Sequence, residues 1–133
     1  MIVVDASIVV PGLVSSSGVG ASARELMSAH AAQLVAPALI DVEVCSALRG
    51  LERSGEIPPS TAEGGVTMLA GMRIERFPHE PLLRRMWELR HNVTPYDATY
   101  VAVAERLDVP LVTFDNRLAK APGIRCSVRL IGS

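Results

Sequence analysis

The stretch TPYDATYVAVAERLDVPLVTFDNRL, residues 94–118, indicates more of the architecture than any other part of the chain. Thr94 fits the N-cap of a helix, and Pro95 fits the first helical position, where its missing backbone N–H has no cost. An apolar helix follows and is expected to end near Asp108, because Pro110 prevents its continuation. The first half of the stretch therefore predicts a helix with a defined beginning and end.

The second half of the stretch predicts a buried strand. Residues 111–114, LVTF, form a short apolar run of the kind found in buried strands, and Asp115 follows them directly. Asp97, in turn, falls in the first turn of the predicted helix. The two carboxylates thus stand at the ends of two elements, where polar groups can gather around a ligand.

The rest of the chain alternates short apolar runs with helical patterns. Strands are expected at residues 1–4, 34–36, 73–77 and 124–131, the last at a sheet edge, and helices at 21–32, 37–54, 60–72 and 81–91, with a short helix or turn at 8–14. Short strands separated by helices predict an α/β fold with a mostly parallel sheet. At this length we expect residues 1–133 to form a single domain.

Composition limits the possible settings of the protein. The net charge of −1 gives no overall basic field for nucleic acid, although a local patch is compatible with it. Cys45 and Cys126 lie in apolar contexts outside any paired motif, so we expect reduced core residues in a cytoplasmic protein. No basic segment precedes the first apolar run, Asp5 interrupts that run, and no run is long enough to span a membrane.

Acidic residues coincide with the predicted strand ends. In parallel sheets, ligands bind outside the carboxyl ends of the strands. Asp5 and Asp115 each follow a predicted strand, and they share this edge if the two strands are neighbours. Glu43 lies on a helix among apolar and small residues with no basic neighbour, so it is either exposed or met by a cation from elsewhere. Asp41, on the same helix, aligns with a more solvated face.

Each carboxylate also has a purely structural interpretation. Asp97 could complete a capping box with Thr94, Asp5 and Asp115 could be turn or N-cap residues, and Glu43 could be a surface residue. The conjunction of all four favours a functional interpretation, because like charges that converge repel unless a cation holds them. An all-oxygen site suits Mg²⁺ or Mn²⁺. The three histidines, His30, His79 and His91, lack the spacing of zinc ligands and are expected to be structural or surface residues.

Three segments together resemble those of PIN-domain proteins, and specifically of VapC-type toxin ribonucleases from bacterial toxin–antitoxin pairs. They are IVVDAS at residues 2–7, APALIDVEVCSALRGL at 36–51 and the stretch at 94–118. The resemblance implies a three-layer α/β fold with a central sheet flanked by helices. It also implies that Asp5, Glu43, Asp97 and Asp115 are the catalytic, metal-binding quartet. Residues 55–72 carry no motif of the family.

The resemblance also implies supporting residues and a mechanism. Ser7 and Thr113 match small hydroxyl positions that support the quartet, whereas the role of Asn116 stays open. Mg²⁺, with Mn²⁺ able to substitute, would activate a water that hydrolyses an RNA phosphodiester bond, with no covalent nucleophile. Arg117 and Lys120 are candidates for holding the RNA backbone, but they could equally be surface charges.

The implied partners are an RNA substrate and a small antitoxin. The antitoxin would fold a disordered tail along the toxin and carry a basic residue into the acidic site. Residues 8–14 and 21–32 would form the walls of its groove. No membrane partner is expected, and the assembly would be a homodimer or a toxin–antitoxin hetero-oligomer.

Two other functional classes are compatible with an α/β chain of this kind. A phosphoacceptor receiver or aspartyl phosphohydrolase needs a nucleophilic Asp with an acidic neighbour and a nearby Lys. Here Ala6 and Ser7 follow Asp5, and Lys120 is the sole lysine, so both features disfavour this class. The other class is a non-catalytic PIN-like domain that binds RNA or protein, which the complete quartet disfavours.

Overall fold

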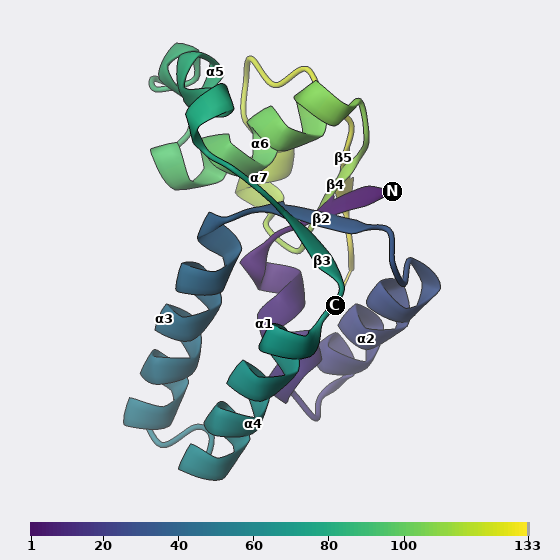
Figure 1. Cartoon of the computed structure of the whole chain (residues 1–133), viewed down its shortest axis with the longest axis vertical. Coiled ribbons are helices and arrows are strands. Elements are labelled where there is room, and N and C mark those ends of the chain that lie inside the picture. The colour runs from purple at the N-terminus through teal and green to yellow at the C-terminus, as the bar shows by residue number, and fades with distance from the viewer. Residues whose placement is uncertain (133) are drawn as a thin grey trace.

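The structure is a computed structural model that describes residues 1–132 and contains a five-stranded sheet flanked by helices (Figure 1). In chain order the elements are β1 (Ile2–Val4), α1 (Ala6–Val14), α2 (Gly18–Ala29), β2 (Leu34–Pro37), α3 (Leu39–Arg53), α4 (Pro59–Gly71), β3 (Ile74–Phe77), the 3₁₀ helix η1 (Glu80–Leu82), α5 (Leu83–Glu88), α6 (Pro95–Leu107), β4 (Leu111–Thr113), α7 (Asn116–Lys120) and β5 (Val128–Leu130). This order confirms the predicted alternation of short strands and helices.

The strands run in the order β3-β2-β1-β4-β5, and each pair of neighbours is parallel. The central strand β1 pairs with β2 on one side and with β4 on the other, where Val3 lies opposite Leu111. Because β1 and β4 are neighbours with the same direction, their carboxyl ends meet. Asp5 and Asp115, which follow soon after these ends, therefore share one edge of the sheet.

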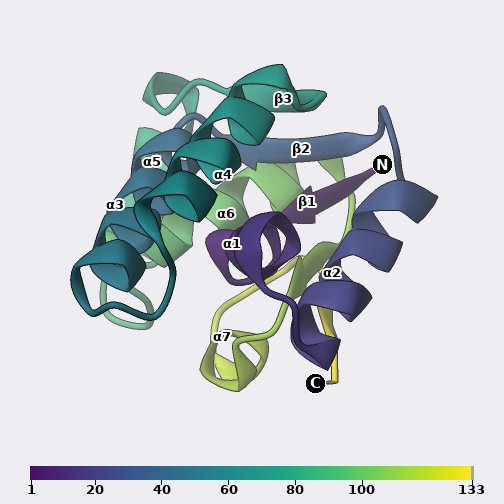
Figure 2. The same ribbon diagram turned by 90° about the horizontal axis from the view of Figure 1, so that it is seen from below.

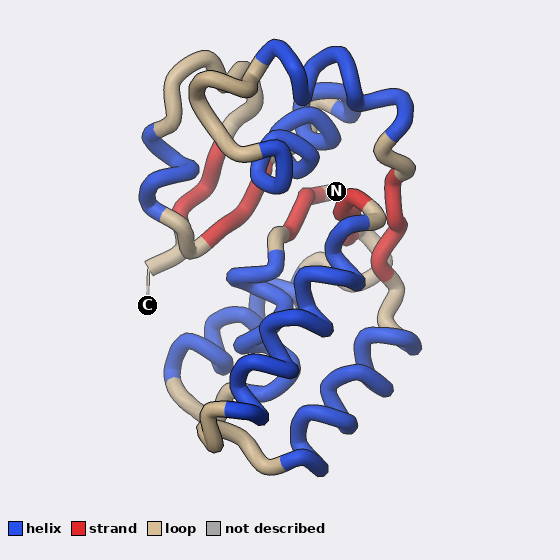
Figure 3. Tube along the Cα trace, turned by 90° about the vertical axis from the view of Figure 1, so that its left-hand side faces the viewer, coloured by secondary structure: helices blue, strands red, loops and turns tan. Residues whose placement is uncertain are grey.

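The helices lie on both sides of the sheet. Seen from below, α1, α2 and α4 lie in front of the strands and α6 lies behind them (Figure 2). The side view shows the strands as a middle layer between two groups of helices (Figure 3). All residues of β1, β2 and β4 are buried, as expected for strands covered on both faces.

Helix α6 forms as its sequence predicts. The Oγ1 atom of Thr94 accepts a hydrogen bond of 3.1 Å from the backbone N–H of Asp97, and Asp108 ends the helix in the left-handed conformation, with φ 54°. Every residue from 98 to 104 is buried, and the helix packs against β1 and β2. This helix therefore holds Asp97 at a fixed place beside the central strand.

Several element boundaries differ from those expected. The helix expected at residues 21–32 ends at Ala29, and Ala32 lies outside it with φ 65°, which no right-handed helix allows. Pro37 does not begin a helix but ends β2, opposite Phe77. The helix expected at residues 81–91 is divided into η1 and the short α5, which ends at Glu88.

The expectation that both cysteines lie in the core is wrong for Cys45. It is exposed, because α3 buries Ile40, Val44 and Leu48 and turns Cys45 to solvent. Cys126 is partly buried against the core, and both thiols are free.

Among residues 1–132, no individual helix has both the length and the apolar character needed to cross a bilayer. Helices α1 and α2 reach these limits only when taken together, and they meet at an angle of 109°.

Candidate active site

Asp5 is the buried carboxylate of the site, only 8% exposed, directly after β1. The hydroxyl of Ser7 donates to its Oδ1 atom at 2.6 Å, and the hydroxyl of Thr113 donates to its Oδ2 atom at 2.6 Å. Although Asp5 is the N-cap residue of α1, its side chain makes no capping hydrogen bond. Its carboxylate is therefore held by two hydroxyls rather than used as a helix cap.

The same two hydroxyls connect β1 to the end of β4. Ser7 Oγ accepts from the backbone N–H of Phe114 at 3.0 Å, and Thr113 Oγ1 accepts from the N–H of Asp115 at 2.9 Å. Each hydroxyl thus donates to Asp5 and accepts from the chain just beyond β4. Small hydroxyl side chains suit both positions because each must donate and accept at once.

Asp97 and Asp115 line one cavity of about 490 Å³ next to this network. Asp115 caps α7: its Oδ1 atom accepts from the N–H groups of Arg117 at 2.9 Å and Leu118 at 3.4 Å. Asp115 is therefore the N-cap of α7, as the capping interpretation predicted, and it uses only its Oδ1 atom for this. The hydrogen bonds of the described residues leave its Oδ2 atom available to a ligand.

Glu43 reaches the site from α3, on the opposite layer from α6. The hydroxyl of Tyr100 donates to its Oε1 atom at 2.6 Å. Glu43 is only partly exposed, and its partner is this neutral hydroxyl rather than the cation considered from the sequence.

The other acidic residue of α3, Asp41, belongs to a different cluster. The guanidinium of Arg76 binds its carboxylate, with Nη2 at 2.9 Å from Oδ1, and also donates to the carbonyl oxygens of Leu69 and Ile74. The Asp41 side chain is 47% exposed, in line with the more solvated face expected for it. Asp41 therefore joins α3 to the α4–β3 connection, outside the group around Asp5.

The pKa values of Asp5 and Asp97 are both raised above their usual values, mainly by burial. Burial is the main cause that raises the pKa of Asp5 above its usual value, and the negative charge of Asp97 adds to it against the opposing hydrogen bonds. Burial also raises the pKa of Asp97, reinforced by the charge of Asp115 and opposed by that of Arg117. The pKa of Tyr100 is raised by burial, by its hydrogen bond to Glu43 and by the surrounding negative charges, so the phenol keeps its proton.

The four carboxylates suit a hard divalent cation chemically, but they are not gathered into a ready-made shell. Within residues 1–132, no three carboxylate, imidazole or thiol groups lie close enough together to hold an ion as they stand. An ion at this site would have to draw the side chains together. Asp97, Asp115 and Glu43 are only partly buried, whereas Asp5 is buried and held by its two hydroxyls.

The remaining residues singled out from the sequence lie around the site. Arg117 is 93% exposed and lines the cavity, whereas Lys120 is exposed near the end of α7 and does not line it. Asn116 is the exposed first residue of α7. Of the histidines, His79 accepts from the backbone N–H of Leu39 and so caps α3, and His91 lines the cavity.

Two contributors were missed in the sequence. Tyr100 lies three residues after Asp97, and this helical spacing places both on one side of α6, which could have suggested its contact with the site. Arg90 lines the cavity from the turn after α5, and nothing in its local sequence indicates this.

Comparison with known proteins agrees with the fold and the order of the segments. The model of the PIN domain family matches residues 2–124. Ribonuclease VapC1 of Mycobacterium tuberculosis is 47% identical over 133 residues, covering 97% of this chain and 96% of the relative.

Two crystal structures have the same fold. VapC20 of M. tuberculosis, described as a Sarcin-Ricin loop cleaving toxin, has a TM-score of 0.69 at 17% identity over 90% of this chain and 93% of its own. PAE2754 of Pyrobaculum aerophilum has a TM-score of 0.65 at 27% identity over 89% and 83%.

Proposed function

The chain belongs to the PIN-domain family, as a VapC-type member, and we propose that it is a metal-dependent endoribonuclease, the toxin of a toxin–antitoxin pair. Its proposed substrate is RNA, its metal Mg²⁺ or Mn²⁺, and its ligands and catalytic residues are Asp5, Glu43, Asp97 and Asp115. Such a substrate would place its action in the cytoplasm. We also propose that residues 1–133 act as one domain.

One observation carries this proposal: Asp97 and Asp115 line one cavity, and the buried Asp5 follows the strand next to the one that Asp115 follows. The hydrogen bond from Tyr100 on α6 connects Glu43 to this region. Burial raises the pKa of Asp5 and of Asp97, and the negative charge of a neighbouring carboxylate adds to each shift. Groups that repel in this way destabilise the fold, so their proximity is explained best by a cation that they bind together. The cavity beside Asp97 and Asp115 supplies room for a phosphate group.

The residues around the site would have different roles in catalysis. Asp5 is fixed by Ser7 and Thr113 and would give the site its rigid ligand. Tyr100 would orient Glu43 by its hydrogen bond. When bound, the metal would supply a water of lowered pKa and would neutralise charge on the phosphate.

The test is cleavage of total cellular RNA by the purified chain with Mn²⁺ and with a chelator. Asp97→Asn keeps the shape of the side chain and removes its charge, so we expect it to abolish most metal-dependent cleavage. Asp108→Asn is the matched control, because Asp108 is an exposed residue at the other end of α6 in the left-handed conformation, which Asn also adopts. Cleavage at the rate of the unchanged protein in Asp97→Asn would contradict the assigned site. RNA binding without any cleavage would instead favour a non-catalytic domain.

The proposed protein partner is a small antitoxin that covers the acidic site and places a basic residue there, where it would meet the same charges as the metal. Residues 8–14 and 21–32 are the proposed walls of its groove. We propose a homodimer or a toxin–antitoxin hetero-oligomer. Purification of the tagged chain from its native host tests this, and repeated recovery of the chain without a small bound protein would contradict it.

A further inference from the structure

The tryptophan and an arginine form an exposed stacked pair at the end of α5. Trp87 is the sole tryptophan of the chain and is 68% exposed. The guanidinium of Arg90 lies over its ring, 4.6 Å from the centroid, and Arg90 Nη1 donates to the carbonyl oxygen of Trp87 at 2.9 Å. We refer to this pair as the Trp87–Arg90 platform. A large aromatic surface left in water in this way is typical of a binding site.

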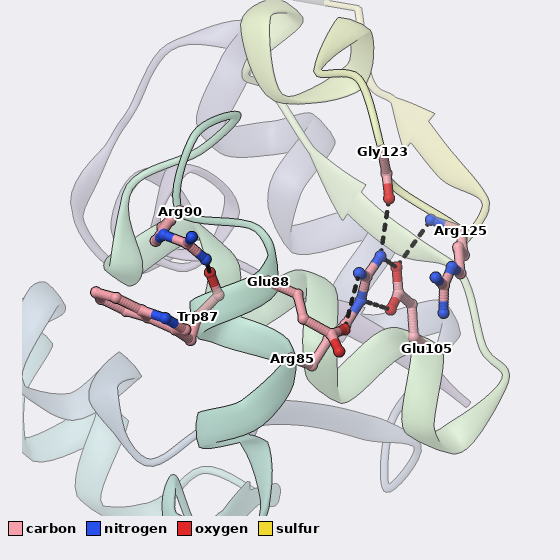
Figure 4. Close-up of polar contacts among 7 residues, drawn as sticks. All are labelled: Arg85, Trp87, Glu88, Arg90, Glu105, Gly123 and Arg125. Carbon is pink, nitrogen blue, oxygen red and sulfur yellow. Dashed lines mark hydrogen bonds and ion pairs between the residues drawn. The ribbon is translucent and has the colours of Figure 1, made fainter.

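The platform is held in place by a cluster of polar contacts behind it. The guanidinium of Arg85 binds both carboxylate oxygens of Glu105 on α6, at 2.6 Å and 3.1 Å, and also the carbonyl oxygen of Gly123 at 2.8 Å. Figure 4 shows this cluster on one side of α5, with Trp87 and Arg90 projecting away from it on the other. The short helix therefore presents the indole at a fixed position rather than on a loose loop.

The platform adjoins the candidate active site. Arg90, His91 and Asn92 line the same cavity of about 490 Å³ as Asp97 and Asp115. Arg90 thus belongs both to the stacked pair and to the wall of the acidic cavity. A ligand that occupies this cavity would contact Arg90, whose guanidinium lies over the indole.

We propose that the Trp87–Arg90 platform binds an unpaired base of the RNA beside the bond to be cleaved; this rests on the ribonuclease function proposed above. The base would stack on the indole, and Arg90 would contact the adjacent phosphate. A planar apolar group next to a phosphate is the repeating pattern of single-stranded RNA, and stacking on aromatic side chains and arginine is how proteins hold such bases.

The charges around the indole favour RNA over a protein partner. Arg84 and Arg90 are exposed on and just after α5, and Arg117 faces the same cavity as Arg90. These three arginines outnumber Glu88, the half-exposed acidic residue next to Trp87, in a chain whose net charge is −1. A protein contact is the competing occupant, because Leu83 on α5 is also 56% exposed.

Because the chain has one tryptophan, its fluorescence reports directly on the platform. Short single-stranded RNA of mixed sequence, added with chelator to prevent cleavage, should quench Trp87 fluorescence. The same RNA annealed to its complement should quench it much less, since its bases are already stacked. Affinity for labelled single-stranded RNA would then be measured by anisotropy for the variants below.

Trp87→Ala should weaken this affinity about fivefold or more, the range found for loss of one stacked base, and Trp87→Phe should recover part of it. Arg90→Ala should lower the slope of log affinity against log salt by about 0.7, as for loss of one phosphate contact on a single strand, and Arg90→Lys should keep the slope. Arg53→Ala and Met68→Ala are matched controls. The first substitution removes one exposed charge at the far end of α3, and the second removes an exposed apolar side chain of α4. Both should bind RNA as the unchanged protein does.

The outcomes separate this inference from the proposed function. If the unchanged protein cleaves RNA but Trp87→Ala and Arg90→Ala bind it like the controls, the platform does not bind RNA. If Trp87→Ala changes the mass measured by light scattering and leaves RNA affinity unchanged, the platform is a protein contact and the inference is overturned. If the unchanged protein neither binds nor cleaves RNA, the proposed function itself fails. Circular dichroism of each variant shows whether it is folded. If an Ala variant does not fold, Trp87→Phe and Arg90→Lys still test the platform.

Discussion

Asp97 combines a structural role and a proposed chemical role in one residue. Its backbone N–H donates the capping hydrogen bond of α6 to Thr94 Oγ1, while its carboxylate interacts electrostatically with Asp5 and Asp115. The capping-box interpretation instead requires the carboxylate of Asp97 to accept from the backbone N–H of Thr94, and the hydrogen bonds of the described residues do not include that contact. Substitution of the carboxylate alone should separate the two roles.

We expect Asp97→Asn to be at least as stable as the unchanged protein when metal is absent. The pKa of Asp97 is raised in the folded state, so the folded state binds more protons than the unfolded state between the two pKa values. Stability therefore falls as pH rises through this window, and the neutral amide removes that loss. Thermal unfolding of Asp97→Asn and of the unchanged protein, with chelator and from acid to neutral pH, measures this difference in stability. If the variant loses about 0.5–2 kcal/mol instead, the carboxylate of Asp97 acts as a cap.

Tyr100 should matter to catalysis only through Glu43. We expect Tyr100→Phe to slow RNA cleavage, because Glu43 loses the hydrogen bond that orients it, and to cost about 1 kcal/mol of stability. The double variant with Glu43→Gln should be no slower than Glu43→Gln alone, since both act on the same carboxylate. Additive losses in this double-mutant cycle would show that Tyr100 acts independently.

At the scale of elements, one largely buried ion pair connects the short helix α5 to α6. Arg85 and Glu105 are largely buried, with side chains 19% and 13% exposed, and their contact joins α5 to α6. Burial alone would raise the pKa of Glu105, but the hydrogen bonds from Arg85 and from the N–H of Arg125 outweigh it and lower the pKa. The pair therefore stabilises α5 at neutral pH.

We expect Glu105→Gln to lower the free energy of unfolding by about 1.5–3 kcal/mol at neutral pH, as for loss of charged hydrogen bonds. A lowered pKa means that this stability is present above the unfolded pKa and is lost as pH falls through the folded pKa. The variant should therefore lose less stability than the unchanged protein between neutral and acid pH.

Glu88→Gln is the matched control for this prediction, because Glu88 contacts the same arginine at 3.3 Å with a side chain 50% exposed. It should change stability by less than about 1 kcal/mol. Equal losses in both variants, measured by urea unfolding, would contradict the special role of Glu105.

The elements that could be predicted from sequence are those with local signals. The Thr94–Pro95 cap and Pro110 define α6, and the apolar runs define β1 and β4. The limits of α5 could not be predicted, because contacts far apart in sequence set them, notably Arg85 with Gly123. The exposure of Cys45 was missed for a related reason, since an apolar sequence context does not show which face of a helix is buried.

At the scale of the whole molecule, the sheet order is what brings the candidate site together. The sequence placed Asp5 and Asp115 at strand ends, but only the pairing of β1 with β4 places them at one edge. The contact between Glu43 and Tyr100 was not predictable, because it joins helices from opposite layers. Local sequence thus indicated which residues end each strand, whereas the partners of these residues depended on the fold.

A divalent ion should stabilise the whole fold if the four carboxylates bind it. Binding to the folded state alone adds about 2.7 kcal/mol when the ion is at one hundred times its Kd. We expect Mn²⁺ to raise the melting temperature of the unchanged protein and of Asp108→Asn. Asp97→Asn and Asp115→Asn should show a much smaller rise. The melting temperatures are measured by thermal unfolding at increasing Mn²⁺ concentrations. The same rise in all four proteins would place the ion elsewhere.

The pairing of an early strand with a late one has a consequence for synthesis on the ribosome. A nascent chain translated as far as α6 carries Asp5, Glu43 and Asp97, but it lacks Asp115 and the strand whose Thr113 holds Asp5. The proposed nuclease would therefore remain incomplete while most of its own messenger is being read. Premature termination anywhere before β4 would release a fragment that lacks both Asp115 and the hydroxyl of Thr113.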